Sequence, residues 1–187
     1  MLKRALILSF IFVGTACAQI GQLVNYTISE SDLERLAMSE IDKHRFEMSV
    51  AGVSARLNVD DLGFAIDENG DGKVHLRTNS VVNASVFGRE YPVKVFLQVA
   101  GVPSYSAADH AIYVRNLTLE NTSIDTEMGQ LNLSGISGQI YDLLHEWLEE
   151  NPVYRFDQDD SRYQLLQQLG LDISIEPGQL RITSAQR

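Results

Sequence analysis

Hydrophobic and polar residues alternate with a period of two along the middle of the chain. The alternation is clearest in residues 53–59, 74–86 and 91–99. A fourth run, residues 112–119, loses its phase at Asn116, which indicates a β-bulge. Because successive side chains of a strand point to opposite faces of a sheet, this pattern predicts long antiparallel strands that bury one face.

On either side of these strands, apolar residues recur at helical spacing. Ser29 can cap a helix that continues to about Asp42, since its hydroxyl can accept from a free N–H group of the first turn. A wide apolar stripe over residues 136–148 predicts a second, long helix. A shorter helix is predicted over residues 161–169, followed by a hairpin over residues 172–183.

Together these elements predict a single α+β domain over residues 26–187. In such a domain the long antiparallel strands form a sheet that packs on the long C-terminal helix, and a short helix lies near the N-terminus. No internal repeat, low-complexity stretch or linker divides the chain. A domain of this length can bury a substantial core.

Long, twisted strands that curl around one helix can leave an elongated apolar groove, lined by the face that also forms the core. The candidate lining residues are Val74, Leu76, Val93, Val95, Leu97, Val114, Leu143, Leu144 and Trp147. Periodicity predicts which face is buried, but it does not distinguish a packed interior from a hollow one. From the residues alone, an ordinary core and a lined tunnel are both open.

The first residues of the chain have the pattern of a secretory signal. Lys3 and Arg4 precede an apolar run over residues 5–13. This run is shorter than the roughly 20 residues that a membrane-spanning helix needs. Small residues then lead to Cys17, the only cysteine of the chain. A thiol in this position is the acceptor for acyl chains in bacterial lipoproteins.

We therefore expect residues 1–16 to be a signal peptide and residues 17–25 to be a tether. Cys17 would be the lipidation site, carrying acyl chains such as palmitate, and would hold the domain to a membrane. An ordinary cut before Gln19 is the alternative, and it would release a soluble periplasmic protein. A single cysteine leaves no intramolecular disulfide to stabilise the fold.

The chain is acidic, with a formal net charge of −10. Loss of Lys3 and Arg4 with the signal would bring this charge to −12. Such a surface repels phosphate backbones, so nucleic-acid binding is not expected. No polybasic patch for anionic lipids is evident either, so membrane attachment should depend on the lipid at Cys17.

No motif predicts catalysis, a cofactor or a metal. Residues 67–74 match the first eight positions of an EF-hand loop, but Thr78 replaces the bidentate glutamate at position twelve. A polar hairpin loop explains the same residues, and calcium binding is the lesser alternative. The histidines are scattered and lack zinc-ligand spacing, at positions His44, His75, His110 and His145. We therefore expect the protein not to be an enzyme.

Short motifs occur in the same order from end to end as in one family. They are Tyr26-Thr27-Ile28-Ser29-Glu30, Asn83-Ala84-Ser85-Val86-Phe87-Gly88, Leu97-Gln98-Val99-Ala100-Gly101-Val102-Pro103, Ala111-Ile112-Tyr113-Val114, Asn151-Pro152-Val153-Tyr154 and Ile175-Glu176-Pro177-Gly178-Gln179-Leu180. In these motifs the chain resembles the YceB-like lipoproteins of Gram-negative bacteria, a family defined as a domain of unknown function.

The resemblance implies a curved antiparallel sheet around a long helix, similar to the tubular lipid-binding (TULIP) superfamily, whose members hold acyl chains in an apolar tunnel. It supplies no catalytic residues. Family members usually have an aliphatic residue three positions before the cysteine, whereas this chain has Gly14. Ala18 follows the cysteine, which by the enterobacterial sorting rule implies the outer membrane.

Two functions are consistent with these features. The first is a membrane-anchored periplasmic lipoprotein that binds or carries a lipid or other apolar small molecule without catalysis. The second is an envelope scaffold or assembly factor that acts through contacts with a protein partner, which the sequence does not identify. Ligand extracted with the purified protein would favour the first function, and one stoichiometric crosslinked partner would favour the second.

Overall fold

The computed structural model describes residues 25–43, 45–50, 53–86, 88–126 and 134–185. The expected signal peptide, the lipidation site Cys17 and nearly all of the expected tether lie outside these residues. The described part of the chain forms two antiparallel sheets and three helices.

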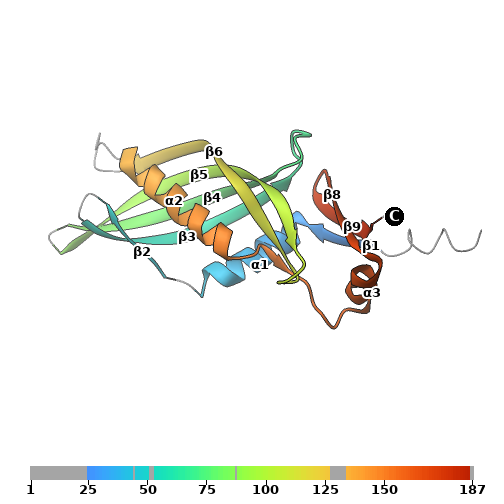
Figure 1. The fold of residues 1–187 in the computed structure, drawn as a ribbon. Helices are drawn as coiled ribbons and strands as arrows, with labels where there is room; N and C mark the ends of the chain where they lie inside the picture. The colour runs from blue at the N-terminus through green and yellow to red at the C-terminus, as the bar shows by residue number, and fades with distance from the viewer. Residues whose placement is uncertain (1–24, 44, 51–52, 87, 127–133, 186–187) are drawn as a thin grey trace, which may run out of the picture.

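The larger sheet is a long, curved surface that wraps around the helix α2, Ser134–Glu150 (Figure 1). Its strands, in spatial order, are β2 (Phe46–Val50), β3 (Val53–Ile66), β4 (Val74–Val86), β5 (Arg89–Ser106), β6 (Ala111–Thr126) and β7 (Tyr154–Arg155). α2 contacts β6 and β5 on one side and β2 on the other, so it crosses the concave face. This arrangement confirms the α+β fold with a curved sheet around a long helix.

The first helix, α1, covers Glu30–Ile41 and begins where the sequence predicted. Ser29 is its N-cap and forms a capping box with Asp32, so that each side chain accepts from the other residue's backbone N–H. Ile28 and Leu33, on either side of this cap, are both fully buried. The local sequence therefore fixes both the start of α1 and the angle at which the chain enters it.

The carboxylates of α1 also protect an edge of the large sheet. β2 pairs with β3 only up to Leu57, so the later residues of β3 lack a neighbouring strand on that side. Glu34 accepts from the backbone N–H of Phe64 at 3.1 Å, and Glu30 accepts from that of Ile66 at 2.8 Å. These bonds satisfy backbone groups that an open edge would leave without partners.

The smaller sheet joins the two ends of the described chain. It consists of β1 (Asn25–Ser29), β9 (Gln179–Ser184) and β8 (Leu171–Glu176), with β9 in the centre. The helix α3, Ser161–Leu169, lies at the same end of the molecule (Figure 1). The sequence predicted α3 and its stop at Gly170, which has a φ of 82°.

An aromatic cluster packs the smaller sheet and α3 against the larger sheet. The rings of Phe156 and Tyr163 stack with centroids 4.4 Å apart, and Tyr26 of β1 meets Phe156 edge-on at 5.5 Å. The Tyr163 hydroxyl is hydrogen-bonded to the hydroxyl of Tyr105 on β5 at 2.8 Å. A backbone bond from Gly178 N to Ile66 O, 2.9 Å long, adds a second link between the sheets.

β6 contains the predicted irregularity. Asn116 has a φ of 54°, and the register between β5 and β6 shifts opposite Gly101. A second shift leaves Glu120 without a paired residue between Leu119 and Asn121. The predicted bulge at Asn116 is thus confirmed, and both shifts increase the local twist of the sheet.

Candidate functional site

An apolar pocket lies between α2 and the concave face of the large sheet. Its cavity is small, about 40 Å³, and it is partly open to solvent. β3, β4 and α2 supply most of its lining, and α1 and β2 contribute one residue each. The lining residues are Ile41, Phe46, Leu57, Val59, Leu62, Thr78, Ser80, Ile140, Leu143, Leu144 and Trp147.

Three of the lining residues expected from the sequence reach this pocket, and all three come from α2. They are Leu143, Leu144 and Trp147. The other six expected residues lie in the buried core and do not line the pocket. These six residues are Val74, Leu76, Val93, Val95, Leu97 and Val114. Beneath these residues the interior is packed, whereas beside β3 it is hollow.

The residues on the sheet side of the pocket are not among the expected lining residues. Leu57 and Val59 of β3 belong to the alternating run over residues 53–59, so the pattern identified their face correctly. Phe46 and Ile41 complete the wall next to them. The pattern could not reveal where the pocket lies, because this depends on how the helix crosses the strands.

The pocket has few polar groups, and each is uncharged. Thr78 and Ser80 of β4 lie on its floor and are 6% and 5% exposed. The indole Nε1–H of Trp147 is buried and has no hydrogen-bond acceptor among the described residues. None of the described residues that line the pocket is acidic or basic.

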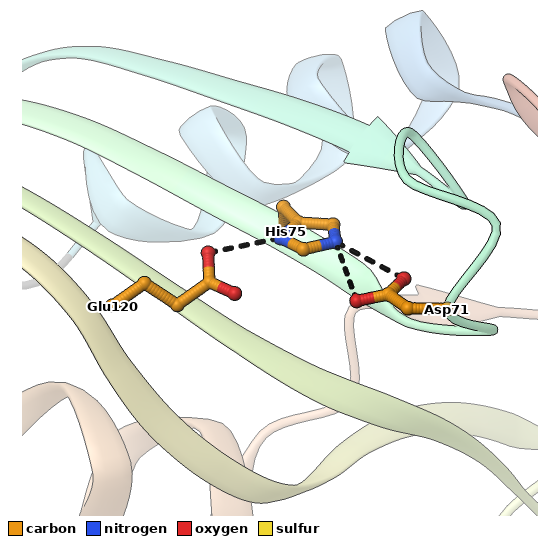
Figure 2. Close-up of side chains that lie close together, drawn as sticks. All are labelled: Asp71, His75 and Glu120. Carbon is orange, nitrogen blue, oxygen red and sulfur yellow. Dashed lines mark hydrogen bonds and ion pairs between the residues drawn. The ribbon is translucent and has the colours of Figure 1, made fainter.

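A second cluster lies on the opposite face of the sheet, around His75 of β4. Figure 2 shows its imidazole between two carboxylates, with Glu120 on one side and Asp71 on the other. His75 Nδ1 lies 3.0 Å from Glu120 Oε2, and Nε2 lies 3.2 Å from Asp71 Oδ2. Small residues flank the ring, because His75 pairs with Ala65 on β3 and with Ala100 on β5.

This environment determines the charge of His75. Burial by itself would lower its pKa, but hydrogen bonds to Glu120 and Asp71 outweigh burial, so the pKa lies above its ordinary value. The hydrogen bond to His75 in turn lowers the pKa of Glu120. Since each ring nitrogen faces a carboxylate, the imidazolium form can donate to both of them.

Asp71, His75 and Glu120 are also a possible metal-ligand set, since their ligand atoms lie within 4.8 Å of one another. However, the two carboxylates lie on opposite sides of the ring, whereas a histidine ligand binds a metal through one nitrogen. The geometry therefore suits an ion-paired imidazolium better than a metal centre. In the adjoining loop, Asp67 Oδ1 accepts from Gly72 N at 2.8 Å, as expected of a polar turn.

None of the helices in the described residues combines the length and the apolar character needed to cross a bilayer.

Comparisons with known proteins place the chain among relatives of unknown function. The uncharacterized lipoprotein YceB of Salmonella typhimurium (strain LT2) is 23% identical over 181 residues, which cover 95% of this chain and 94% of the relative. Among solved structures, a crystal structure of lipopolysaccharide binding protein is similar with a TM-score of 0.38 and 9% identity. That similarity covers 86% of this chain but only 40% of the other. The model of one family, described as "Protein of unknown function (DUF1439)", matches residues 28–179, and the chain therefore belongs to this family.

Proposed function

We propose that the protein is a lipoprotein of the cell envelope that holds a lipid or other apolar ligand in the pocket between α2 and β3–β4. The observation that carries this proposal is the pocket itself, which is partly open to solvent and has an almost entirely apolar lining. Ligand pockets in proteins are likewise lined mostly by hydrophobic and aromatic side chains.

Binding would be driven by the removal of apolar surface from water, which contributes about 25 cal/mol for each Å² buried. No chemical step is needed, so the proposed role is to hold or carry the ligand. Trp147 and Phe46 offer flat aromatic surfaces, and aliphatic side chains from β3 and α2 supply the rest of the wall.

The proposed location depends on the N-terminal residues. The relative YceB is described as a lipoprotein, and Cys17 of this chain follows a signal-like segment. Acylation of Cys17 would place the domain on a membrane of the envelope, and Ala18 favours the periplasmic face of the outer membrane. An acidic surface without a polybasic patch is consistent with attachment through the lipid.

Native mass spectrometry of the protein purified from membranes tests this function. We expect an added mass that organic solvent extracts as a lipid. Val59→Phe should reduce the ligand-bound fraction severalfold, because Val59 lines the pocket and the larger ring would fill it. Val81→Phe is the matched control, since this half-buried valine of β4 does not line the pocket.

Two results would overturn the proposal. One is a protein that is consistently free of ligand at every stage of purification. The other is a bound lipid whose amount is the same in wild type and in the Val59→Phe variant. A single protein partner that crosslinks equally to both forms would instead favour the scaffold function.

A further inference from the structure

We infer that the outer face of α3 rests on the membrane that holds the acylated Cys17, with Leu165 and Leu169 in contact with the lipid. This inference rests on the proposed function, because it requires a lipid anchor at Cys17, but it does not involve the pocket beside α2. Three observations carry it: two exposed leucines on one face of α3, the position of α3 beside β1, and the short length of chain between β1 and Cys17.

The exposed leucines are the first observation. Leu165 and Leu169 are among the most exposed large hydrophobic side chains of the described residues, at 38% and 36%. They lie one turn apart on the same face of α3. The opposite face carries Tyr163 and Leu166, which are completely buried. α3 therefore packs one apolar face against the protein and presents a second, smaller apolar face to its surroundings.

The second observation is that α3 lies directly beside the strand that begins the described chain. It contacts both β1 and β9, which lie at the same end of the molecule (Figure 1). The guanidinium of Arg162, in the first turn of α3, stands over the ring of Tyr26 of β1, 5.1 Å from its centroid. Leu165 follows Arg162 by one turn. The exposed face of α3 thus begins next to β1.

The third observation is the short chain between β1 and Cys17. β1 begins at Asn25, eight residues after Cys17. A chain spans at most about 3.6 Å per residue, so Asn25 must lie within about 29 Å of the acylated residue. A membrane that holds Cys17 is therefore nearest to the end of the molecule that carries α3.

The opposite end of the large sheet is much farther from this anchor. Tyr105, near the end of β5, is hydrogen-bonded to Tyr163 of α3 at 2.8 Å, whereas Arg89 begins the same strand. At roughly 3.3 Å per residue, Arg89 lies about 50 Å from Tyr105 along the strand. The two ends of β5 therefore provide a near and a far position relative to the proposed membrane contact.

The charges around α3 favour an apolar contact over an electrostatic one. α3 has no acidic residue and one basic residue, Arg162, which is paired with Asp160 at 2.6 Å. Asp157 and Asp159 are exposed in the segment before the helix, so an anionic bilayer would not attract this end of the protein. Burial of leucine side chains at a lipid surface requires no charge. We therefore expect the contact to be insensitive to salt.

A fluorescent probe at Gln168 tests the inference in the acylated, full-length protein. Gln168 is exposed and lies one turn from Leu165, so Gln168→Cys leaves both leucines in place. Labelling is specific, because acylation consumes the thiol of Cys17, the only cysteine of the chain. The protein is labelled with the dye NBD and reconstituted into vesicles of phosphatidylcholine, a lipid without net charge. Glu90→Cys carries the same dye as a control, since Glu90 is exposed and lies at the far end of β5.

We expect a nitroxide attached to the lipid to quench the dye at Gln168 about threefold more than the dye at Glu90, and aqueous iodide to quench it less. A higher salt concentration should leave the lipid quenching unchanged, because screening weakens only contacts between charges. In the Gln168→Cys protein, Leu165→Gln together with Leu169→Gln should bring the quenching to the values of the Glu90 site. Leu119→Gln is the matched control: this leucine is 42% exposed on β6 of the large sheet, so its replacement should leave the contact intact.

The outcomes separate this inference from the proposed function. Equal lipid quenching at Gln168 and Glu90, in protein that remains on the vesicles, would overturn the inference and leave the lipoprotein in place. Shielding from iodide without quenching by the lipid nitroxide would also overturn it, since another protein surface would then cover α3. A protein without an acyl chain at Cys17 would overturn both the proposed location and this inference. A pocket that never holds a ligand would overturn the proposed binding function alone.

Discussion

His75 on β4 and Glu120 on β6 meet across an intervening strand, with Nδ1 and Oε2 3.0 Å apart. Two features of the sheet allow this contact. Ala100 of β5 pairs with His75 and is too small to separate the two side chains. Glu120 lies at a register shift that leaves it unpaired in the ladder. Asp71 contacts the imidazole from the loop between β3 and β4. The buried imidazole of His75 therefore links this loop to β6, which lies two strands away from β4 in the sheet.

Stability should depend on pH through His75. The pKa of His75 is raised in the folded protein. Its stabilising contribution is therefore fully present at a pH below about 6.5, which is the pKa of an unperturbed histidine. This contribution is lost as the pH rises through the pKa of the folded state. The pKa of Glu120 is lowered in the folded protein, so the stabilising contribution of Glu120 is lost as the pH falls through this lowered pKa. We expect the free energy of unfolding, measured with urea, to decline from pH 6 toward alkaline pH.

His75→Gln identifies the group responsible. This variant should be about 1–3 kcal/mol less stable at pH 6, since charge-assisted bonds to both carboxylates are lost. The difference from wild type should shrink as the pH rises. His145→Gln is the control, because the His145 side chain is 37% exposed and lies 3.7 Å from the Glu149 carboxylate, so it makes only a long, solvent-exposed contact. A His75→Gln variant with the same pH profile as wild type would contradict this explanation.

Gly101 should not tolerate a side chain. A Cβ atom there would lie 2.4 Å from Val114 Cγ1 and 2.9 Å from the backbone oxygen of Arg115, on the neighbouring strand. Because the backbone oxygen cannot rotate away, Gly101→Ala should reduce the free energy of unfolding by about 1–3 kcal/mol. Gly138→Ala on α2 is the matched control: its Cβ meets nothing within 4 Å, and it should stabilise the helix by about 0.5–1 kcal/mol. Equal effects of both substitutions on urea denaturation would refute the steric argument.

The cap of α1 should contribute measurably to stability. Ser29→Ala removes the side chain that accepts from Asp32 N, and N-cap substitutions of this kind cost about 1 kcal/mol. Thermal unfolding followed by circular dichroism would show a lower midpoint. Ser39→Ala, at an exposed position within the same helix, should change stability by less than about 0.5 kcal/mol. If Ser29→Ala is no worse than Ser39→Ala, the capping box does not stabilise the protein.

Membrane attachment should depend on Cys17. We expect Cys17→Ser to abolish metabolic labelling with a palmitate analogue and to release the protein from washed membranes, because serine lacks the thiol that we propose as the acyl acceptor. Thr15→Ser, two residues earlier, keeps a small side chain in the signal and should leave labelling unchanged. Full membrane retention of the Cys17→Ser variant would instead support attachment through a partner.

Much of this fold could be predicted from local sequence patterns. The alternation of residues 74–86 and 91–99 predicted two strands, and these residues lie in β4 and β5. The cap at Ser29 predicted the start of α1. The strands β1 and β7 were not predicted. β1 is five residues long and pairs with β9, and β7 is two residues long and pairs with β6. Each of these short strands forms because of a partner that is distant in the sequence.

The sites were harder to predict for a related reason. Val74 and Leu57 both face inward on adjacent strands, yet only Leu57 lines the pocket, because the position of the pocket depends on the path of α2 over the sheet. In the sequence, His75 is one of four scattered histidines. Its two carboxylates lie four and 45 residues away, and only strand pairing with its register shifts brings Glu120 to the ring.

The pairing of β1 with β9 has a consequence for the order of folding. β1 begins at Asn25, near the start of the chain, whereas its partner β9 ends at Ser184. During synthesis, β1 therefore has no partner until almost the whole chain has emerged. The large sheet can assemble earlier from its consecutive hairpins, whose contacts are closer in sequence. Closure of the small sheet is then the final step, and a chain truncated before β9 would leave the strand nearest to Cys17 unpaired.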